Sequence, residues 1–326
     1  MKKPLIPWFI LSVALLYIWS LTRYDYYRKN AQPVISFYDT THVHLHIHHE
    51  QEPAAIYALY TNLIEGSRKI VQAVPEDQTH YVLSIPLNSP RPIQLYCNEE
   101  VIPIFVIPDS SLYVDVVLNP IFGSIDSLSF YGFTAPICRY QELKRKVEPT
   151  QRRLNILDAT DFSVYVRLLD SIADNQRNFL LAYQEELPPW FEAYEESEIA
   201  YHKAYLKLSH AFQREVDPGL LDSVAVNNSS AIFSYYYYLY LRTLIRGELL
   251  QRGSYGSLDM AEAHLETANQ LLEGEVKDFY LVWYISDFIR KNNPQRGKKL
   301  TSRFSGQIEA EKYKKYLLSY AGDPSN

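Results

Sequence analysis

The sequence predicts an α+β protein in which a β-rich module precedes an all-helical one. Three observations predict this arrangement. After Pro33, apolar and polar residues alternate in several short runs, as they do in half-buried strands. Beyond Gly132 the apolar residues recur with the 3.6-residue period of a helix. An uncharged segment precedes both modules. We therefore divide the chain into residues 1–30, 31–132 and 133–326.

The first part, residues 1–30, contains no formal charge between residues 5 and 22. A helix of this length spans about 27 Å, which is just enough to cross the hydrocarbon core of a bilayer. No Ala-x-Ala-like cleavage site follows it. We therefore expect an uncleaved signal or membrane anchor; a cleaved signal peptide is the alternative. The basic residues on its two sides nearly balance. Because a short tail before a single helix usually stays in the cytoplasm, we expect inner-membrane anchoring in the cell envelope with the body in the periplasm.

Seven short runs in residues 31–132 have the composition of strands, and Pro, Asn, Asp and Ser separate them. Short strands without helices between them predict an antiparallel β-sandwich or an open barrel. The runs are residues 42–48, 55–63, 81–85, 93–97, 102–107, 112–118 and 127–131.

The first run places four histidines on one face of its strand, since alternate side chains point the same way. They are His42, His44, His46 and His48. Two alternate imidazoles can converge on Zn²⁺, Ni²⁺ or Cu²⁺, but a closed site needs further ligands from neighbouring strands. The sequence places no carboxylate or cysteine there. The alternative is a solvated strand face whose intervening Val43, Leu45 and Ile47 point into the core.

The helical module is expected to be a bundle of about six helices. An apolar stripe runs from Tyr165 to Tyr183, and Leu187-Pro188-Pro189 ends that helix because proline disfavours helix before it and lacks a donor. The remaining helices are expected at residues 190–215, 231–250, 259–272, 276–291 and 307–320.

Four consecutive tyrosines, Tyr235, Tyr236, Tyr237 and Tyr238, lie in one of these helices. At 100° per residue they cover about three quarters of its circumference, so they cannot all face one core. One interpretation is an exposed stacking surface that binds a peptide or glycan. The other is a central helix whose hydroxyls find partners between neighbouring helices.

Another candidate is the group Glu192, Glu195, Glu196 and Glu198, with His202 one turn after Glu198. A glutamate and a histidine at this spacing can share a metal ion or a proton. The alternative is a solvated acidic helix start, which the helix dipole favours.

Composition excludes several classes of protein. The net charge of −6 and the lack of a dense basic cluster exclude nucleic acid as the main partner. Two cysteines, Cys97 and Cys138, allow one disulfide or two buried thiols, but no Cys-x-x-Cys pair. The sequence also lacks the serine-hydrolase elbow, the His-Glu-x-x-His pair, the phosphate loop and the dinucleotide fingerprint. We therefore expect a protein without catalytic residues and without a bound cofactor, apart from Zn²⁺ or Cu²⁺ at the histidine strand.

Several segments resemble the N-terminal region of TlpA-like thiol-disulfide oxidoreductases of the Bacteroidota type. They are residues 105–114 (FVIPDSSLYV), residues 130–135 (FYGFTA), residues 191–206 and residues 271–278 (LLEGEVKD). The family's Pro-Gly-Asp turn lacks its glycine here. In that family a small β domain and a helical region precede a thioredoxin domain, whose Trp-Cys-x-x-Cys motif has no counterpart in this chain.

The resemblance implies an accessory role in the envelope, with a separate redox protein or a peptide as the partner. A second hypothesis is a truncated or split oxidoreductase whose thioredoxin domain is encoded separately. A third is metal binding by the histidine strand.

Overall fold

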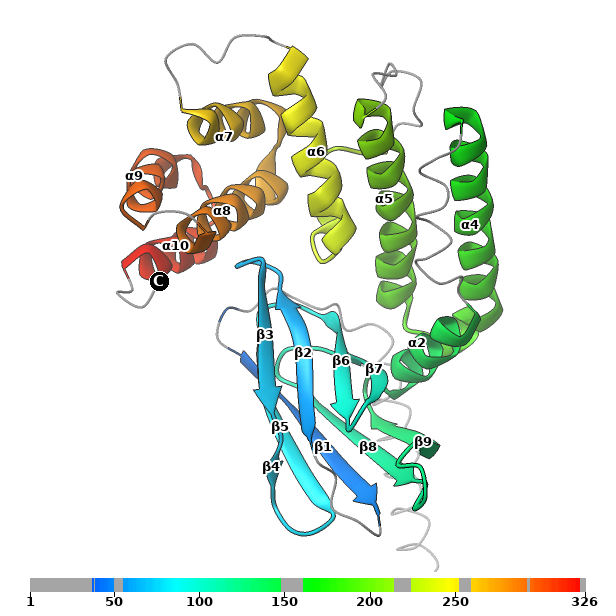
Figure 1. Ribbon diagram of the computed structural model, residues 1–326. Helices are drawn as coiled ribbons and strands as arrows, with labels where there is room; N and C mark the ends of the chain where they lie inside the picture. The colour runs from blue at the N-terminus through cyan, green and yellow to red at the C-terminus, as the bar shows by residue number, and fades with distance from the viewer. Residues whose placement is uncertain are drawn as a thin grey trace, which may run out of the picture.

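The computed structural model describes residues 37, 39–49, 55–147, 161–213, 224–251, 259–291 and 294–322. Over these residues the protein is α+β, with nine strands in two sheets and eight α-helices. The strands form a sandwich at the bottom of Figure 1, and most of the helices lie above it. The expected membrane segment, residues 5–22, lies outside the described residues. No helix in the described part of the chain is long and apolar enough to cross a membrane.

The sandwich contains all seven predicted strands and two more, β3 and β4, that were not predicted. One sheet has the order β4 (Val74–Pro75), β5 (His80–Leu87), β1 (Asp39–His48), β8 (Ser111–Leu118) and β9 (Ile125–Gly132). The other has the order β3 (Ser67–Gln72), β2 (Ile56–Asn62), β6 (Arg91–Cys97) and β7 (Glu100–Val106).

One strand pair differs from the predicted antiparallel arrangement, because β1 and β8 are parallel neighbours. Parallel strands need a long connection between them. Here strands β2 to β7, which belong to both sheets, lie between β1 and β8 in the chain. The sandwich is therefore antiparallel, as predicted, except at this pair.

The helices number more than the six expected. They are α2 (Ala135–Val147), α4 (Phe162–Tyr183), α5 (Pro189–Gln213), α6 (Tyr235–Gln251), α7 (Met260–Leu271), α8 (Gly274–Lys291), α9 (Pro294–Phe304) and α10 (Glu311–Gly322). Aspartate side chains cap two N-termini: Asp161 accepts from Ser163 N–H at 2.8 Å and Asp259 from Ala261 N–H at 3.1 Å.

Two hydrophobic cores cross the boundary that composition places at Gly132. The sandwich core includes Tyr140 from α2 and Phe191 from α5. The helical core includes Leu63 and Ile64 from the turn between β2 and β3. Each module therefore completes the core of the other.

The change from strand to helix depends on Gly132. Its φ of +109° lies in the region that favours glycine, and a Cβ atom there would lie 2.9 Å from the carbonyl oxygen of Ser111. The chain then enters α2, which packs on the sandwich through Ile137 and Cys138.

Candidate metal centre

The histidines of β1 lie on the outer face of the five-stranded sheet. Between them Val43, Leu45 and Ile47 are at most 2% exposed and fill the sandwich core. The alternation predicted from the sequence is therefore present in the strand. On the outer face, the sheet register sets which neighbours each histidine meets.

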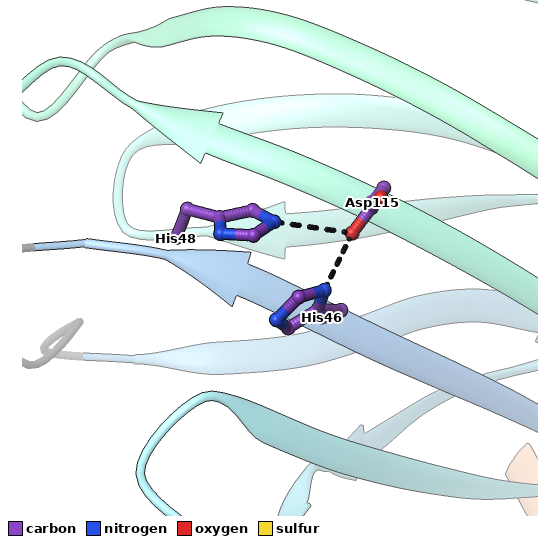
Figure 2. Close-up of side chains that lie close together, drawn as sticks. All are labelled: His46, His48 and Asp115. Atoms are coloured by element: carbon purple, nitrogen blue, oxygen red, sulfur yellow. Dashed lines mark ion pairs between the residues drawn. The ribbon is translucent and has the colours of Figure 1, made fainter.

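The register brings a carboxylate beside two of these histidines. His46 pairs with Asp115 on the parallel strand β8. His46 Nδ1 lies 2.9 Å from Asp115 Oδ1, and His48 Nε2 lies 3.5 Å from the same oxygen. Figure 2 shows the two rings on β1 and the carboxylate on β8 pointing toward one another. One ligand atom from each residue lies within 4.8 Å of the other two.

These separations fit a tetrahedral metal ion. Around an ion with bonds of about 2.0–2.1 Å, ligand atoms lie about 3.3–3.4 Å apart. The two measured distances bracket that value, and the ligand atoms of the two rings lie within 4.8 Å of each other. Two imidazoles and one carboxylate suit Zn²⁺ and Cu²⁺. Three protein ligands leave at least one coordination position for water or another ligand.

The cluster is accessible to a hydrated ion. The side chains of His46, His48 and Asp115 are 37%, 48% and 36% exposed. Asp115 Oδ1 is nevertheless buried and has no aligned hydrogen bond among the described residues, although both imidazole nitrogens face it. A cation would bind this oxygen together with the two ring nitrogens that face it.

His80 is the neighbour of His46 on the other side, across the antiparallel pair with β5. Its ring stacks on that of His46 with centroids 4.4 Å apart and planes 2° from parallel. Imidazole lone pairs lie in the ring plane, so two stacked rings do not direct them at one ion. His80 Nδ1 also lies 2.9 Å from Asp77 Oδ2. We assign His80 to the support of His46 and not to the ligand set.

His42 and His44 lie apart from the three ligand atoms. His44 stacks on Tyr113 at 4.7 Å. His42 Nδ1 lies 3.2 Å from the Ser84 hydroxyl. The structure thus brings together only His46 and His48 of the four predicted histidines, and it adds Asp115. Sequence analysis missed Asp115 because its position depends on the pairing of strands about 70 residues apart.

The four tyrosines of α6 divide between surface and core. Tyr235 is 45% exposed, whereas Tyr237 and Tyr238 are buried. The Tyr237 hydroxyl donates to Val226 O at 2.5 Å and the Tyr238 hydroxyl to Ile232 O at 2.6 Å. They do not form a common stacking surface, because two of the rings belong to the helical core.

The cysteines are free, buried thiols. Cys97 pairs in register with Glu100 at one end of β7, and Cys138 Sγ accepts from Phe105 N–H at 3.3 Å near the other end. Five residues of strand separate these points by about 16 Å. Disulfides need Cα atoms closer than about 7 Å. Burial raises the pKa of Cys97 to about 11 and that of Cys138 to about 12, so both stay protonated.

The carboxylates at the start of α5 also differ in their exposure to solvent. Glu196 is exposed and pairs with Arg177, with Oε1 2.6 Å from Nε. Glu195 is 2% exposed and pairs with Lys144 of α2. Glu198 and His202 line a cavity beside this ion pair. The interpretation as a solvated helix start therefore fails for Glu195 and Glu198.

No protein-family model and no curated protein matches this chain. The resemblance to TlpA-like oxidoreductases consequently stays a prediction.

Proposed function

We propose that this chain is a noncatalytic binding protein of the cell envelope, and that the outer face of its β sandwich binds a divalent transition metal, Zn²⁺ or Cu²⁺. A single observation carries the metal proposal: the convergence of His46 Nδ1, His48 Nε2 and Asp115 Oδ1. The ligands lie on a flat strand face, which leaves the ion open to exchange. Such a site suits the capture or transfer of an ion.

The envelope assignment rests on the uncharged residues 5–22, and the noncatalytic role rests on the missing catalytic motifs. In this assignment the body lies in the periplasm, and residues 5–22 attach it to the inner membrane.

The metal site is tested with untagged protein titrated with Zn²⁺ and with Cu²⁺ in competition with a chromogenic chelator. We expect one ion per chain. His46→Ala, His48→Ala and Asp115→Asn should each weaken binding by about tenfold or more, because each removes one ligand. His42→Ala is the matched control, since it removes a histidine from the same face of the same strand without touching the three ligand atoms. Equal affinities for all four variants would overturn the proposal.

A second candidate is an accessory or split partner of a thiol-disulfide oxidoreductase. The observation that favours it is the position of two quoted motifs in the fold. Residues 130–135 span the change from β9 to α2, and residues 271–278 span the turn from α7 to α8. The DNA adjoining the gene should then encode a thioredoxin domain with Trp-Cys-x-x-Cys; a neighbourhood without one would count against this candidate.

A further inference from the structure

A cavity of about 200 Å³ lies between α2, α4, α5 and α6. Its wall has an apolar part and a charged part. The apolar part includes Leu169, Ile172, Ile199 and Leu206, and the charged part includes Lys144, Lys203, Glu195 and Glu198. It is separate from the candidate metal centre, which lies on the outer face of the sandwich.

Three of these four charged groups are engaged in ion pairs. Lys144 pairs with Glu195, which also accepts from the Tyr140 hydroxyl at 3.2 Å. Lys203 Nζ lies 3.2 Å from Asp170 Oδ1. The fourth, Glu198, has no ion pair within the described ranges of the chain.

Glu198 has polar neighbours, but the hydrogen-bonding capacity of its carboxylate is only partly used. The Ser234 hydroxyl and the Tyr235 backbone N–H lie beside its carboxylate and lower its pKa. Its Oε1 atom is buried and has no hydrogen-bond partner among the described residues. A buried oxygen of this kind normally has a partner, because burial removes the water that would otherwise bind it.

The groups around Glu198 do not neutralise it. Burial is the largest of several effects that together raise its pKa to about 7; Glu195 also raises this pKa, whereas the Ser234 hydroxyl, Lys144 and the Tyr235 N–H lower it. Burial and Lys144 lower the pKa of His202 to about 4, so this imidazole is neutral and stacks on Tyr236 at 3.8 Å. Arg91 from β6 is a more distant cation, and its Nη2 donates to Ser89 Oγ at 2.9 Å.

We propose that this cavity binds a small organic monocation, a primary amine with a short apolar body. Its ammonium group donates to Glu198 Oε1, and its hydrocarbon part contacts Leu169, Ile172 and Leu206. Lys144 keeps its pair with Glu195, and Lys203 keeps its pair with Asp170, which Lys207 also contacts at 2.7 Å. A cavity of this volume accommodates one short chain, so a large ligand fits poorly.

The test uses n-pentylammonium as the probe, with 1-pentanol as its uncharged counterpart, and calorimetry on the full chain. We expect pentylammonium to bind in saturable fashion at pH 8, where Glu198 is ionised. At pH 5.5 the affinity should fall by about tenfold or more, because binding then requires ionisation of a protonated carboxyl group. The amine stays protonated throughout, and 1-pentanol should bind weakly with little dependence on pH.

Glu198→Gln keeps the size of the side chain and should abolish the preference for pentylammonium over 1-pentanol. Glu192→Gln, on the same helix, is the control and should bind as the wild type does. Circular dichroism establishes that each variant is folded. Equal pentylammonium binding by wild type and Glu198→Gln would overturn the proposal, as would the absence of saturable binding to folded wild type at pH 8.

Discussion

Two clusters in this molecule combine imidazole with carboxylate, and they differ in their access to water. On the sheet face, His46, His48 and Asp115 are each exposed by about a third or more. In the cavity on α5, burial favours the uncharged forms of Glu198 and His202 by raising the pKa of one and lowering that of the other. The same residue types thus suit an incoming hydrated ion in one place and a desolvated organic cation in the other.

The difference in access to water also predicts which substitutions lower the stability of the protein most. A charge that is removed from a buried ion pair leaves its partner in a medium that solvates it poorly, whereas an exposed partner is solvated by water. The polar groups of the cavity should therefore matter for stability, and those of the sheet face mainly for binding.

The largest effect is expected for Glu195→Ala, which removes the carboxylate that pairs with Lys144. The free energy of unfolding in urea should fall by about 3–5 kcal/mol. Glu196→Ala, the next residue on the exposed side of the helix, should cost less than about 1 kcal/mol. Replacing Lys144 and Glu195 together by methionine should cost less than Glu195→Ala alone. Similar values for Glu195→Ala and Glu196→Ala would contradict the expected difference between buried and exposed ion pairs.

A smaller effect is expected from pH. Because the pKa of Glu198 is about 7 in the folded state and 4.5 ordinarily, the folded protein binds more protons between these values. Its stability therefore falls as pH rises through this window. Glu198→Gln lacks this contribution. The difference in unfolding free energy, variant minus wild type, should therefore rise by up to about 3 kcal/mol between about pH 4.5 and 8.

His202 acts in the opposite direction, since its lowered pKa makes stability rise between about pH 4 and 6.5. It is present in both proteins, so its contribution cancels in the difference. Denaturant titrations at several pH values give that difference, and a pH-independent difference would contradict the buried character of Glu198.

The smallest effect is expected for Asp115→Asn without metal. The side chain is exposed and its neighbours are histidines, so the unfolding free energy should change by less than about 1 kcal/mol. With Zn²⁺ in excess, the wild type should gain stability because the ion binds only the folded state, whereas Asp115→Asn should gain little. A large loss without metal would show that the outer face has a structural role.

Much of the β module could be predicted from the sequence because its strands alternate between core and solvent. β3 was missed since Arg68, Lys69 and Ile70 are all exposed along this edge strand, so no alternation appears. β4 has only two residues, one of them Pro75. In the helical module, α9 was missed because it is short, begins with Pro294 and is mostly polar and basic, although its buried positions Gly297, Leu300, Thr301 and Phe304 follow the helical period.

The candidate sites were less predictable. Strand periodicity alone predicts that His46 and His48 lie on the same face of β1. Asp115 lies beside them only because β1 pairs with β8. Likewise Glu198 and His202 are neighbours by helical spacing. Their burial depends on α2, α4 and α6, and no local pattern encodes the distance between those helices.

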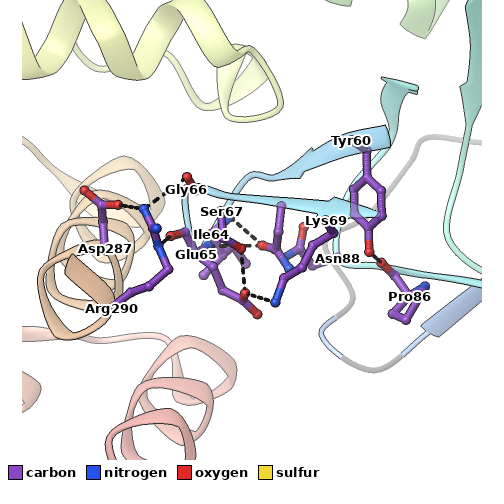
Figure 3. Close-up of polar contacts among 11 residues, drawn as sticks. Tyr60, Ile64, Glu65, Gly66, Ser67, Lys69, Pro86, Asn88, Asp287 and Arg290 are labelled. Carbon is purple, nitrogen blue, oxygen red and sulfur yellow. Dashed lines mark hydrogen bonds and ion pairs between the residues drawn. The ribbon is translucent and has the colours of Figure 1, made fainter. Parts of the chain in front are cut away.

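The turn between β2 and β3 contacts α8, a helix that lies far from it in the sequence. Arg290 of α8 donates to Glu65 O at 3.3 Å and to Gly66 O at 3.4 Å, and Asp287 holds its guanidinium group at 2.7 Å, as Figure 3 shows. Beside these contacts Ile64 is 1% exposed within the helical core.

That insertion sets an order of events during synthesis. Glu65 and Arg290 are 225 residues apart in the chain. At roughly 5–20 residues per second, the ribosome needs roughly ten to forty-five seconds to make the intervening segment. Until α8 emerges, Ile64 has no apolar surface of that helix to cover it. The turn between β2 and β3 therefore exposes an apolar side chain when the sandwich first forms. The last contacts of the sandwich form only after most of the polypeptide has been translated.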